Sequence, residues 1–269
     1  MKVVLLRLSY IPLLAFLCLN LFAFIMSEKL IFLPPAPSYP DNAEGFVEIV
    51  EGEDTRIVGF YHPPAEPGGP VLLWSHGNSE DAGSIRPLLN RFAQRGLGYL
   101  AYDYPGYGLS GGEPSEKGTY RAADEAYRYL TEQRNHKEED IFLVGQSVGS
   151  GPSSYLAEKG AGAALILISP FKSTFRVLTQ VKILPWDRFD NWKRMKKISI
   201  PLLLIHGDVD EVVPYSHGKA LFARHSGDSK ELMSLPGVGH NDLWPLADDE
   251  VGDTIIRFIT REWSGEALE

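Results

Sequence analysis

A serine lies between two glycines in the stretch Gly145-Gln146-Ser147-Val148-Gly149. The apolar residues 141–144 before it are typical of a strand, and residues 150–159 after it are compatible with a helix. In a sharp turn from strand to helix a serine hydroxyl is exposed, and flanking glycines let neighbouring backbone pass close by. The pattern makes Ser147 a candidate nucleophile.

A serine hydroxyl becomes a good nucleophile only when a base removes its proton, and a histidine base needs a carboxylate to orient it. The apolar run 200–205 leads into His206-Gly207-Asp208-Val209-Asp210-Glu211, and residues 231–235 lead into a glycine-rich loop that contains His240. Loops that follow parallel strands gather at one edge of a sheet. We therefore expect His240 and an acid to reach Ser147, and spacing alone leaves Asp208, Asp210 and Glu211 as candidates for that acid.

A second Gly-x-Ser-x-Gly pattern, around Ser110, competes with the first. It follows a loop-like composition and precedes Glu113 and Pro114, so a structural role in a loop is the better interpretation of Ser110. The overlapping Gly-x-Gly-x-x-Gly at residues 106–111 raises a dinucleotide-binding alternative. No helix can open directly at its third glycine, which argues against that alternative.

Strands and helices alternate along most of the chain, which predicts an α/β fold with a mainly parallel sheet. Eight strands are predicted near residues 45–51, 55–61, 70–75, 97–103, 140–144, 163–168, 200–205 and 230–235. Apolar residues recur at helical spacing from Tyr120 to Leu130. Pro152 predicts an irregular start for the helix after Ser147.

These motifs, together with Ser75-His76-Gly77-Asn78 and the segment Tyr102-Asp103-Tyr104-Pro105-Gly106-Tyr107-Gly108, resemble those of the α/β-hydrolases over about residues 45–263. The combination is similar to a small serine-hydrolase branch that contains membrane-associated hydrolases and eukaryotic protein depalmitoylases. The resemblance implies an eight-stranded, mostly parallel sheet flanked by helices, with a short cap. It implies Asp210 as the acid, from a His-Gly-x-x-Asp motif, and an oxyanion hole formed by the backbone N–H groups of Asn78 and Val148. The depalmitoylases carry an N-terminal cysteine cluster, which this chain lacks, since Cys18 is its one cysteine.

The expected activity is hydrolysis of carboxylic esters or thioesters through an acyl-enzyme. An amide or peptide hydrolase and a non-catalytic, membrane-anchored binding protein of the same fold remain alternatives. His76 and His206 are expected to have structural roles at strand ends, with no metal and no cofactor. A net charge of −9 argues against a nucleic-acid partner, and we expect a monomeric catalytic domain.

Residues 170–198 stand where caps occur in such enzymes and are rich in apolar side chains. A helix packed on the sheet face is favoured here over a full lid. In either arrangement Trp186 is expected to line an acyl-binding groove.

The N-terminal residues form a separate region. Nineteen positions from Leu8 to Met26 carry no charge, and at about 1.5 Å per residue they span about 28 Å, close to the thickness of a bilayer core. No small-x-small cleavage site follows, which favours an uncleaved signal anchor over a secreted or periplasmic protein. Lys2 and Arg7 then place the N-terminus in the cytoplasm and the catalytic domain outside it. The predicted organisation is an anchor at 1–27, a proline-rich linker at 28–44 that acts as a stiff spacer, and a catalytic domain at 45–269.

Overall fold

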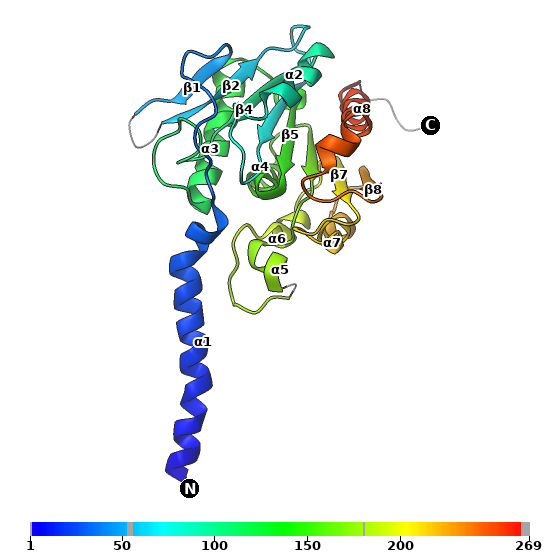
Figure 1. Ribbon diagram of the computed structural model, residues 1–269. Helices are drawn as coiled ribbons and strands as arrows, with labels where there is room; N and C mark the ends of the chain where they lie inside the picture. The colour runs from blue at the N-terminus through cyan, green and yellow to red at the C-terminus, as the bar shows by residue number, and fades with distance from the viewer. Residues whose placement is uncertain (1, 53–55, 180, 265–269) are drawn as a thin grey trace.

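A computed structural model describes residues 2–52, 56–179 and 181–264, and an eight-stranded sheet is its centre (Figure 1). The strand order is β1-β2-β4-β3-β5-β6-β7-β8, and β2 runs against the other described strands. The strands are β1 (Phe46–Val50), β2 (Ile57–His62), β3 (Val71–Ser75), β4 (Gly98–Tyr102), β5 (Ile141–Gln146), β6 (Ala164–Ile168), β7 (Leu202–Gly207) and β8 (Lys230–Leu235). The eight predicted strands are confirmed, although Thr55, the first residue predicted for the second, lies outside the described residues.

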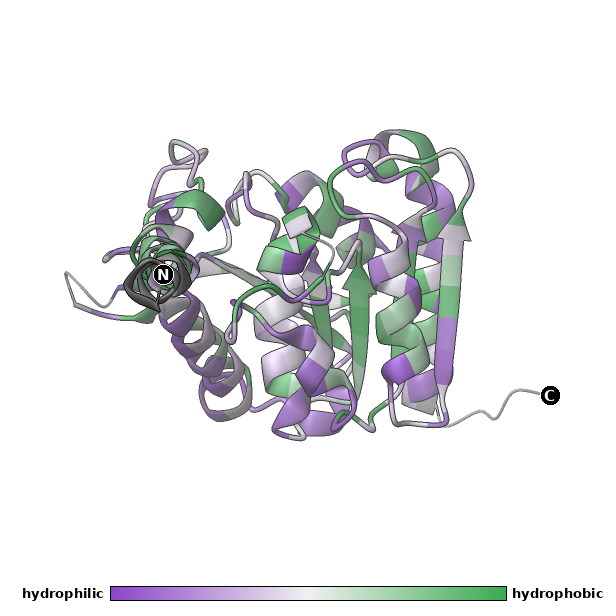
Figure 2. Cartoon of the chain, turned by 90° about the horizontal axis from the view of Figure 1, so that it is seen from below, coloured by the Kyte–Doolittle hydropathy of each residue, from purple (hydrophilic) through white to green (hydrophobic). Residues whose placement is uncertain are grey.

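Helices cover both faces of this sheet. One face carries α3 (Glu116–Arg128), α4 (Ser150–Glu158) and α7 (Ser216–Arg224), and the other carries α2 (Arg86–Gln94) and α8 (Leu243–Ser264). A π-helical turn (Tyr129–Gln133) extends α3, and a 3-10 turn (Glu138–Asp140) precedes β5. Figure 2 shows the largely hydrophobic strands between these helices.

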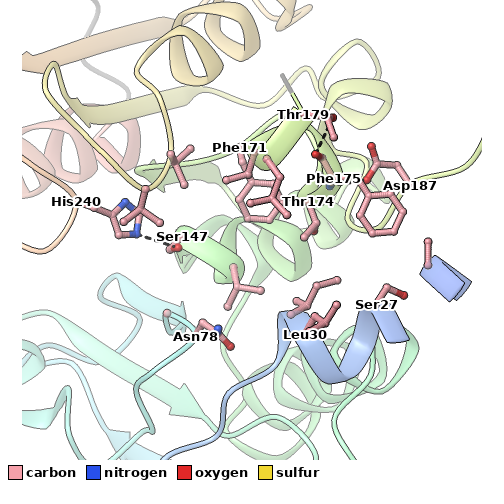
Figure 3. A pocket seen from close by; sticks show the side chains of 18 of the residues that line it. Ser27, Leu30, Asn78, Ser147, Phe171, Thr174, Phe175, Thr179, Asp187 and His240 are labelled. Carbon is pink, nitrogen blue, oxygen red and sulfur yellow. Dashed lines mark hydrogen bonds between the residues drawn. The ribbon is translucent and has the colours of Figure 1, made fainter. Parts of the chain in front are cut away.

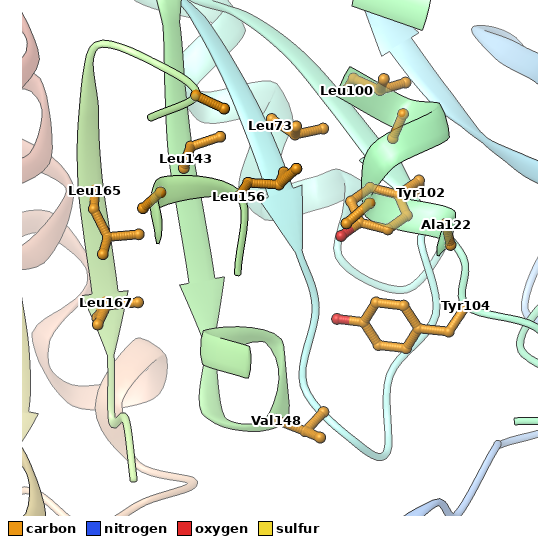
Figure 4. Close-up of a cluster of buried hydrophobic side chains, with 14 of the residues drawn as sticks. Leu73, Leu100, Tyr102, Tyr104, Ala122, Leu143, Val148, Leu156, Leu165 and Leu167 are labelled. Atoms are coloured by element: carbon orange, nitrogen blue, oxygen red, sulfur yellow. The ribbon is translucent and has the colours of Figure 1, made fainter. Parts of the chain in front are cut away.

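The core consists of two apolar layers, one on each side of the sheet. Leu73, Leu143 and Leu165 pack toward α3 and α4 (Figure 4), whereas Leu72 and Phe142 face α2 and α8. Side chains alternate between the two faces along each strand, and a parallel sheet covered on both faces needs apolar residues on both. This requirement explains why the strands appear in the sequence as continuous hydrophobic runs.

Helix α1 (Lys2–Ile31) projects from the domain beside the edge where the parallel strands end (Figure 1). Within it, the most apolar 18-residue window of Tyr10–Ile31 has a mean hydropathy of 2.1 and is 6% buried, so this helix is long and apolar enough to cross a membrane. Large apolar side chains such as Leu14, Leu17 and Phe22 are more than half exposed. A bilayer would remove this surface from water.

The segment after α1 lies against the domain. Phe32 is buried beside Tyr107 and Phe189, and the Ser38 backbone N–H donates to Asp81 Oδ2 at 2.7 Å. Tyr39 is also buried, and its hydroxyl donates to the buried Asp103 carboxylate. The expectation of a stiff spacer between anchor and domain is wrong, because these residues form part of the packed structure.

The cap contains two short helices, α5 (Thr174–Thr179) and α6 (Asn191–Met195). No residue of α5 is buried, and this helix lies beyond the carboxyl edge of the sheet (Figure 1). The expectation of a helix packed on the sheet face is therefore wrong for α5. Phe175 and Leu178 of this helix instead face a groove.

Candidate active site

The turn between β5 and α4 holds Ser147 in a strained backbone conformation. Ser147 has φ = 52°, which few residues other than glycine adopt, and it opens a 3-10 turn, Ser147–Gly149, that leads into α4. A Cβ atom added at Gly149 would overlap the carbonyl oxygens of Ser75 and His76, and one at Gly145 would press on the Gly149 backbone. Both glycines are required for the close packing that exposes the serine. The predicted irregular helix start is confirmed by this 3-10 turn.

The structure brings Ser147, His240 and Asp210 into one hydrogen-bonded chain. His240 Nε2 lies 3.1 Å from Ser147 Oγ, and His240 Nδ1 lies 2.7 Å from Asp210 Oδ2. Because a carboxylate can only accept, Nδ1 carries the proton and Nε2 is left free to accept from the serine hydroxyl. The three residues come from the ends of β5, β7 and β8, which lie at the same edge of the sheet.

Asp210 is buried and held in place by several donors. Its Oδ1 accepts from the backbone N–H groups of Val212 at 2.9 Å and Val213 at 2.6 Å, and His206 Nε2 lies 3.3 Å from Oδ2. Burial raises the pKa of this carboxyl, but the hydrogen bonds from His206, His240 and Val213 outweigh burial and hold the pKa well below its ordinary value. Asp210 is therefore ionised at neutral pH.

The other acids of this loop have different partners. Asp208 Oδ1 accepts from the Gly237 backbone N–H at 2.7 Å, and Glu211 Oε2 accepts from the His240 backbone N–H at 3.3 Å. Of the three candidates, Asp210 is the one that reaches the imidazole ring. Asp208 and Glu211 instead connect the acid loop to the histidine loop.

His206 has the structural role at a strand end that was expected, and it also lies near Asp210, a contact that the sequence prediction did not include. Its ring is fully buried at the end of β7, and Nε2 lies 2.9 Å from the Val213 carbonyl oxygen as well as near Asp210. The ring therefore fixes the loop that carries the acid. The four-residue spacing between His206 and Asp210 across Gly207 was the available sequence signal.

His76 and Ser110 are both buried, and the hydrogen bonds described for them go to residues other than Ser147. His76 Nδ1 lies 2.7 Å from the Gly77 carbonyl oxygen and Nε2 lies 3.4 Å from Asp103, which fits the expected structural role. Ser110 Oγ donates to the Asp103 carbonyl oxygen at 3.2 Å and accepts from the Val58 N–H at 3.1 Å. Helix α3 begins only at Glu116, as the argument against a dinucleotide site requires.

A groove of about 730 Å³ opens directly over Ser147 (Figure 3). Asn78, Val148 and His240 line its catalytic end. The Asn78 side-chain oxygen accepts from the Tyr107 hydroxyl at 2.6 Å and from the Leu33 N–H at 3.1 Å, which fixes the loop after β3. Both residues expected to form the oxyanion hole thus lie next to the serine.

The walls of the groove are mostly apolar and come from three parts of the chain. The cap contributes Phe171, Phe175 and Leu178, and the acid loop contributes Val212 and Val213. The third wall is α1, through Leu19, Phe22, Ala23, Ser27, Leu30 and Ile31.

Trp186 does not line this groove, contrary to the prediction. Its ring packs edge-on against Phe175 of α5 at 5.0 Å and against Phe24 of α1 at 6.0 Å between centroids. Trp186 therefore joins the cap to α1 behind the groove wall. Hydropathy placed Trp186 in an apolar region but carried no information about its packing partners.

No cluster of three or more histidine, cysteine or acidic side chains that could hold a metal ion occurs among residues 2–52, 56–179 and 181–264. The polar groups around Ser147 are instead engaged with one another in the hydrogen bonds described above. The arrangement can supply a nucleophile, a base and an orienting carboxylate from side chains alone.

Comparisons with known proteins agree with this fold. A family model described as serine aminopeptidase, S33, matches residues 67–186 and 190–243. Alpha/beta hydrolase domain-containing protein 17B of Xenopus tropicalis is 32% identical over 266 residues, covering 88% of this chain and 91% of the relative. The protein of the same name from Homo sapiens is 32% identical over 247 residues, covering 81% and 85%. An esterase structure from Pyrococcus furiosus has the same fold, with a TM-score of 0.70 at 17% identity, covering 85% of this chain and 99% of that one.

The sheet, the strand-to-helix elbow and the loops at its carboxyl edge define an α/β-hydrolase. The chain belongs to the serine aminopeptidase S33 family of that superfamily, in the branch of the alpha/beta hydrolase domain-containing proteins 17. The matched part of the family model begins at residue 67 and so does not include α1.

Proposed function

We propose that this hydrolase cleaves carboxylic esters or thioesters of apolar acyl chains through a Ser147-His240-Asp210 triad. The observation that carries the proposal is the continuous hydrogen-bonded chain from Ser147 through His240 to Asp210 at the end of an apolar groove. A nucleophile, a base and an orienting group in this order are what acyl transfer to serine requires.

In the first half of the reaction His240 Nε2 takes the proton of Ser147 Oγ as this oxygen attacks the substrate carbonyl carbon. The tetrahedral intermediate then collapses and the bond to the leaving alcohol or thiol breaks. His240 returns the proton to the leaving oxygen or sulfur, which departs neutral. Ser147 is left acylated, and the negative charge of Asp210 stabilises the imidazolium that forms during the step.

In the second half a water molecule attacks the acyl carbonyl and gives a proton to His240. Collapse of the second intermediate breaks the bond to Ser147, which recovers its proton from His240. The carboxylic acid leaves and the enzyme is restored. In both halves the backbone N–H groups of Asn78 and Val148 are proposed to bind the oxyanion, where donors of this kind contribute about 3–4 kcal/mol each to transition-state stability.

The groove favours an uncharged acyl group over the N-terminus of a peptide. An aminopeptidase must bind an ammonium group, for which a buried carboxylate with free capacity is the natural partner. The two carboxylates that line this groove already accept other hydrogen bonds: Glu80 from the Gly77 N–H at 2.7 Å, and Asp187 from the Ser173 hydroxyl at 2.6 Å and the Phe175 N–H at 2.9 Å. The family name alone therefore does not make peptides the favoured substrates.

The proposal is tested by labelling with a fluorophosphonate probe and by hydrolysis of p-nitrophenyl butyrate. We expect Ser147→Ala to abolish labelling and His240→Ala to reduce it strongly, while Ser110→Ala labels like the wild type. Asp210→Asn should lower kcat by about four orders of magnitude, because the amide stabilises the wrong tautomer of His240. Asp208→Asn is the matched control and should stay within about tenfold of the wild type.

A folded wild-type protein that neither labels nor hydrolyses the ester would overturn the proposal in favour of the non-catalytic alternative. Equal losses in the Asp208 and Asp210 variants would remove Asp210 from its proposed role. Hydrolysis of leucine p-nitroanilide in preference to the ester would support the peptidase alternative.

We further propose that α1 is retained as a membrane anchor, with the N-terminus in the cytoplasm and the hydrolase domain on the other side. The support is that the end of α1 is integrated into the domain: Ser27 is buried and accepts from Arg188 Nε at 3.1 Å. Cleavage behind the apolar run would remove a wall of the groove. The orientation rests on Lys2 and Arg7, which precede the span.

A further inference from the structure

One face of α1 lines the groove over the nucleophile. The groove-lining positions 19, 22, 23, 27, 30 and 31 recur at intervals of three and four residues, which places them on one side of a helix. Leu30 lies near Asn78 at the catalytic end (Figure 3). At about 1.5 Å per residue, Ala23 lies about 10 Å farther along the helix axis, and the groove continues between α1 and the cap.

Specific contacts hold α1 against the cap. Phe24 packs edge-on against Trp186, and the Arg188 guanidinium lies over both rings, at 5.9 Å from the Phe24 centroid and 5.4 Å from that of Trp186. Arg188 also donates to Ser27 Oγ and pairs with Glu28 at 3.4 Å. The position of α1 is thus set by packing and polar contacts just where the helix leaves its most apolar stretch.

The same helix is the segment that is able to cross a membrane. Leu19, Phe22 and Ala23 belong to the stretch Tyr10–Ile31, whose most apolar window has a mean hydropathy of 2.1. On the opposite wall, Leu178 and Ile183 of the cap line the groove while 87% and 52% exposed. Apolar side chains gathered at one end of a domain mark a surface that contacts another apolar phase. Both walls of the outer groove therefore carry apolar side chains, and one of these walls belongs to the helix that is able to cross a membrane.

We propose that α1 is a wall of the acyl-binding groove and that this groove opens sideways into one leaflet of the membrane. Resting on the proposed function, this assigns as substrates acyl esters or thioesters whose long chains reside in the bilayer. The chain passes between α1 and the cap while its carbonyl carbon reaches Ser147. The α1 residues that face the groove then determine how long a chain is accepted.

The test uses full-length protein in phosphatidylcholine vesicles and p-nitrophenyl esters of butyrate, octanoate, laurate and palmitate. Ala23→Trp obstructs the outer groove, and we expect it to lower the ratio of kcat/KM for palmitate to kcat/KM for butyrate at least about tenfold. Leu30→Trp obstructs the groove nearer Ser147 and should also reduce octanoate hydrolysis. Leu21→Trp is the matched control, because Leu21 lies on the same helix, is 60% exposed and does not line the groove.

Fluorophosphonate labelling of each variant shows whether its catalytic end is folded. Unchanged palmitate hydrolysis in both the Ala23 and the Leu30 variants, or equal loss in the Leu21 control, overturns the inference. A wild type that cleaves butyrate but not vesicle-bound palmitate overturns it as well, while leaving the proposed function intact. A wild type that cleaves no ester and takes up no probe overturns the proposed function and this inference with it.

Discussion

At the scale of single residues, the proposed acid depends on a second histidine. Asp210 is buried, and His206, His240 and two backbone N–H groups share its oxygens. The sequence allowed the prediction of Ser147, His240 and an acid between residues 208 and 211 because each follows a hydrophobic strand, and the resemblance to a family motif selected Asp210 among the acids. The sequence predicted a structural role for His206 at the strand end but not the contact of this ring with Asp210, which depends on how the loop after β7 folds back.

A neighbouring histidine gives a prediction about stability. His217 is buried at the start of α7, where its Nδ1 accepts from the Lys172 N–H at 3.2 Å. Burial and the nearby charges of Lys172, His206 and Arg176 lower the pKa of His217 from 6.5 to about 4. The unfolded chain therefore binds a proton between these values and the folded one does not, so the stabilisation is present above pH 6.5 and is lost as the pH falls toward 4.

We expect His217→Gln to reduce the pH dependence of the unfolding free energy, because glutamine can accept the same hydrogen bond without titrating. The difference in unfolding free energy between wild type and variant should change by about 3 kcal/mol at most between pH 7 and pH 4. Urea unfolding at a series of pH values measures it. Parallel curves for the two proteins over this range would contradict the assignment.

At the scale of elements, the elbow is the point where the fold and the chemistry depend on the same backbone. Gly149→Ala places a Cβ against the carbonyl oxygens of Ser75 and His76, and we expect it to destabilise the fold by about 3 kcal/mol or more and to displace Ser147. Gly252→Ala in α8 is the matched control, since nothing lies within 4 Å of its added Cβ. That change should stabilise the fold by about 0.5–1 kcal/mol.

Thermal unfolding of the detergent-solubilised protein, with probe labelling as a second readout, distinguishes the two glycines. Equal midpoints in both variants would show that the elbow tolerates a side chain at residue 149. That result would argue against the close approach of β3 to the elbow as the reason why residue 149 is glycine.

The sheet was predictable at this scale, whereas the cap and the linker were not. Each buried strand must be apolar on both faces, so it can be recognised in the sequence as a hydrophobic run without knowing which elements pack against it. The partners of Trp186 and Tyr39 come from α1 and from Asp103, residues distant in the chain. Hydropathy records that such side chains are apolar, but their position depends on how separate segments meet.

At the scale of the whole molecule, α1 and the cap lie on the same side of the sheet (Figure 1). The carboxyl edge with Ser147 therefore faces the surface that α1 enters, and the opposite edge, where Lys137 precedes β5, faces away. In the arrangement that we propose, the domain stands on the bilayer with its groove facing the membrane.

This orientation predicts which positions contact lipid. Cys18 is the one cysteine of the chain, so a Cys18→Ser background allows single labelling with an environment-sensitive dye. We expect a blue-shifted emission, quenched by brominated lipids, for Leu178→Cys in vesicles. The lysine side chain of Lys137 is 75% exposed at the far edge, and the dye attached in Lys137→Cys should show the unshifted, unquenched emission of a dye in water. Similar spectra at both positions would contradict the orientation.

The chain packs into the domain directly after α1, without an intervening linker. Phe32 is buried directly after the helix, and the next backbone N–H, that of Leu33, donates to Asn78 beside the nucleophile. A spanning helix tilts when its apolar length exceeds the thickness of the hydrocarbon layer. If α1 spans the bilayer as proposed, its tilt would act through two residues on the loop that carries Asn78, and we expect the rate of hydrolysis to change with the thickness and composition of the surrounding membrane.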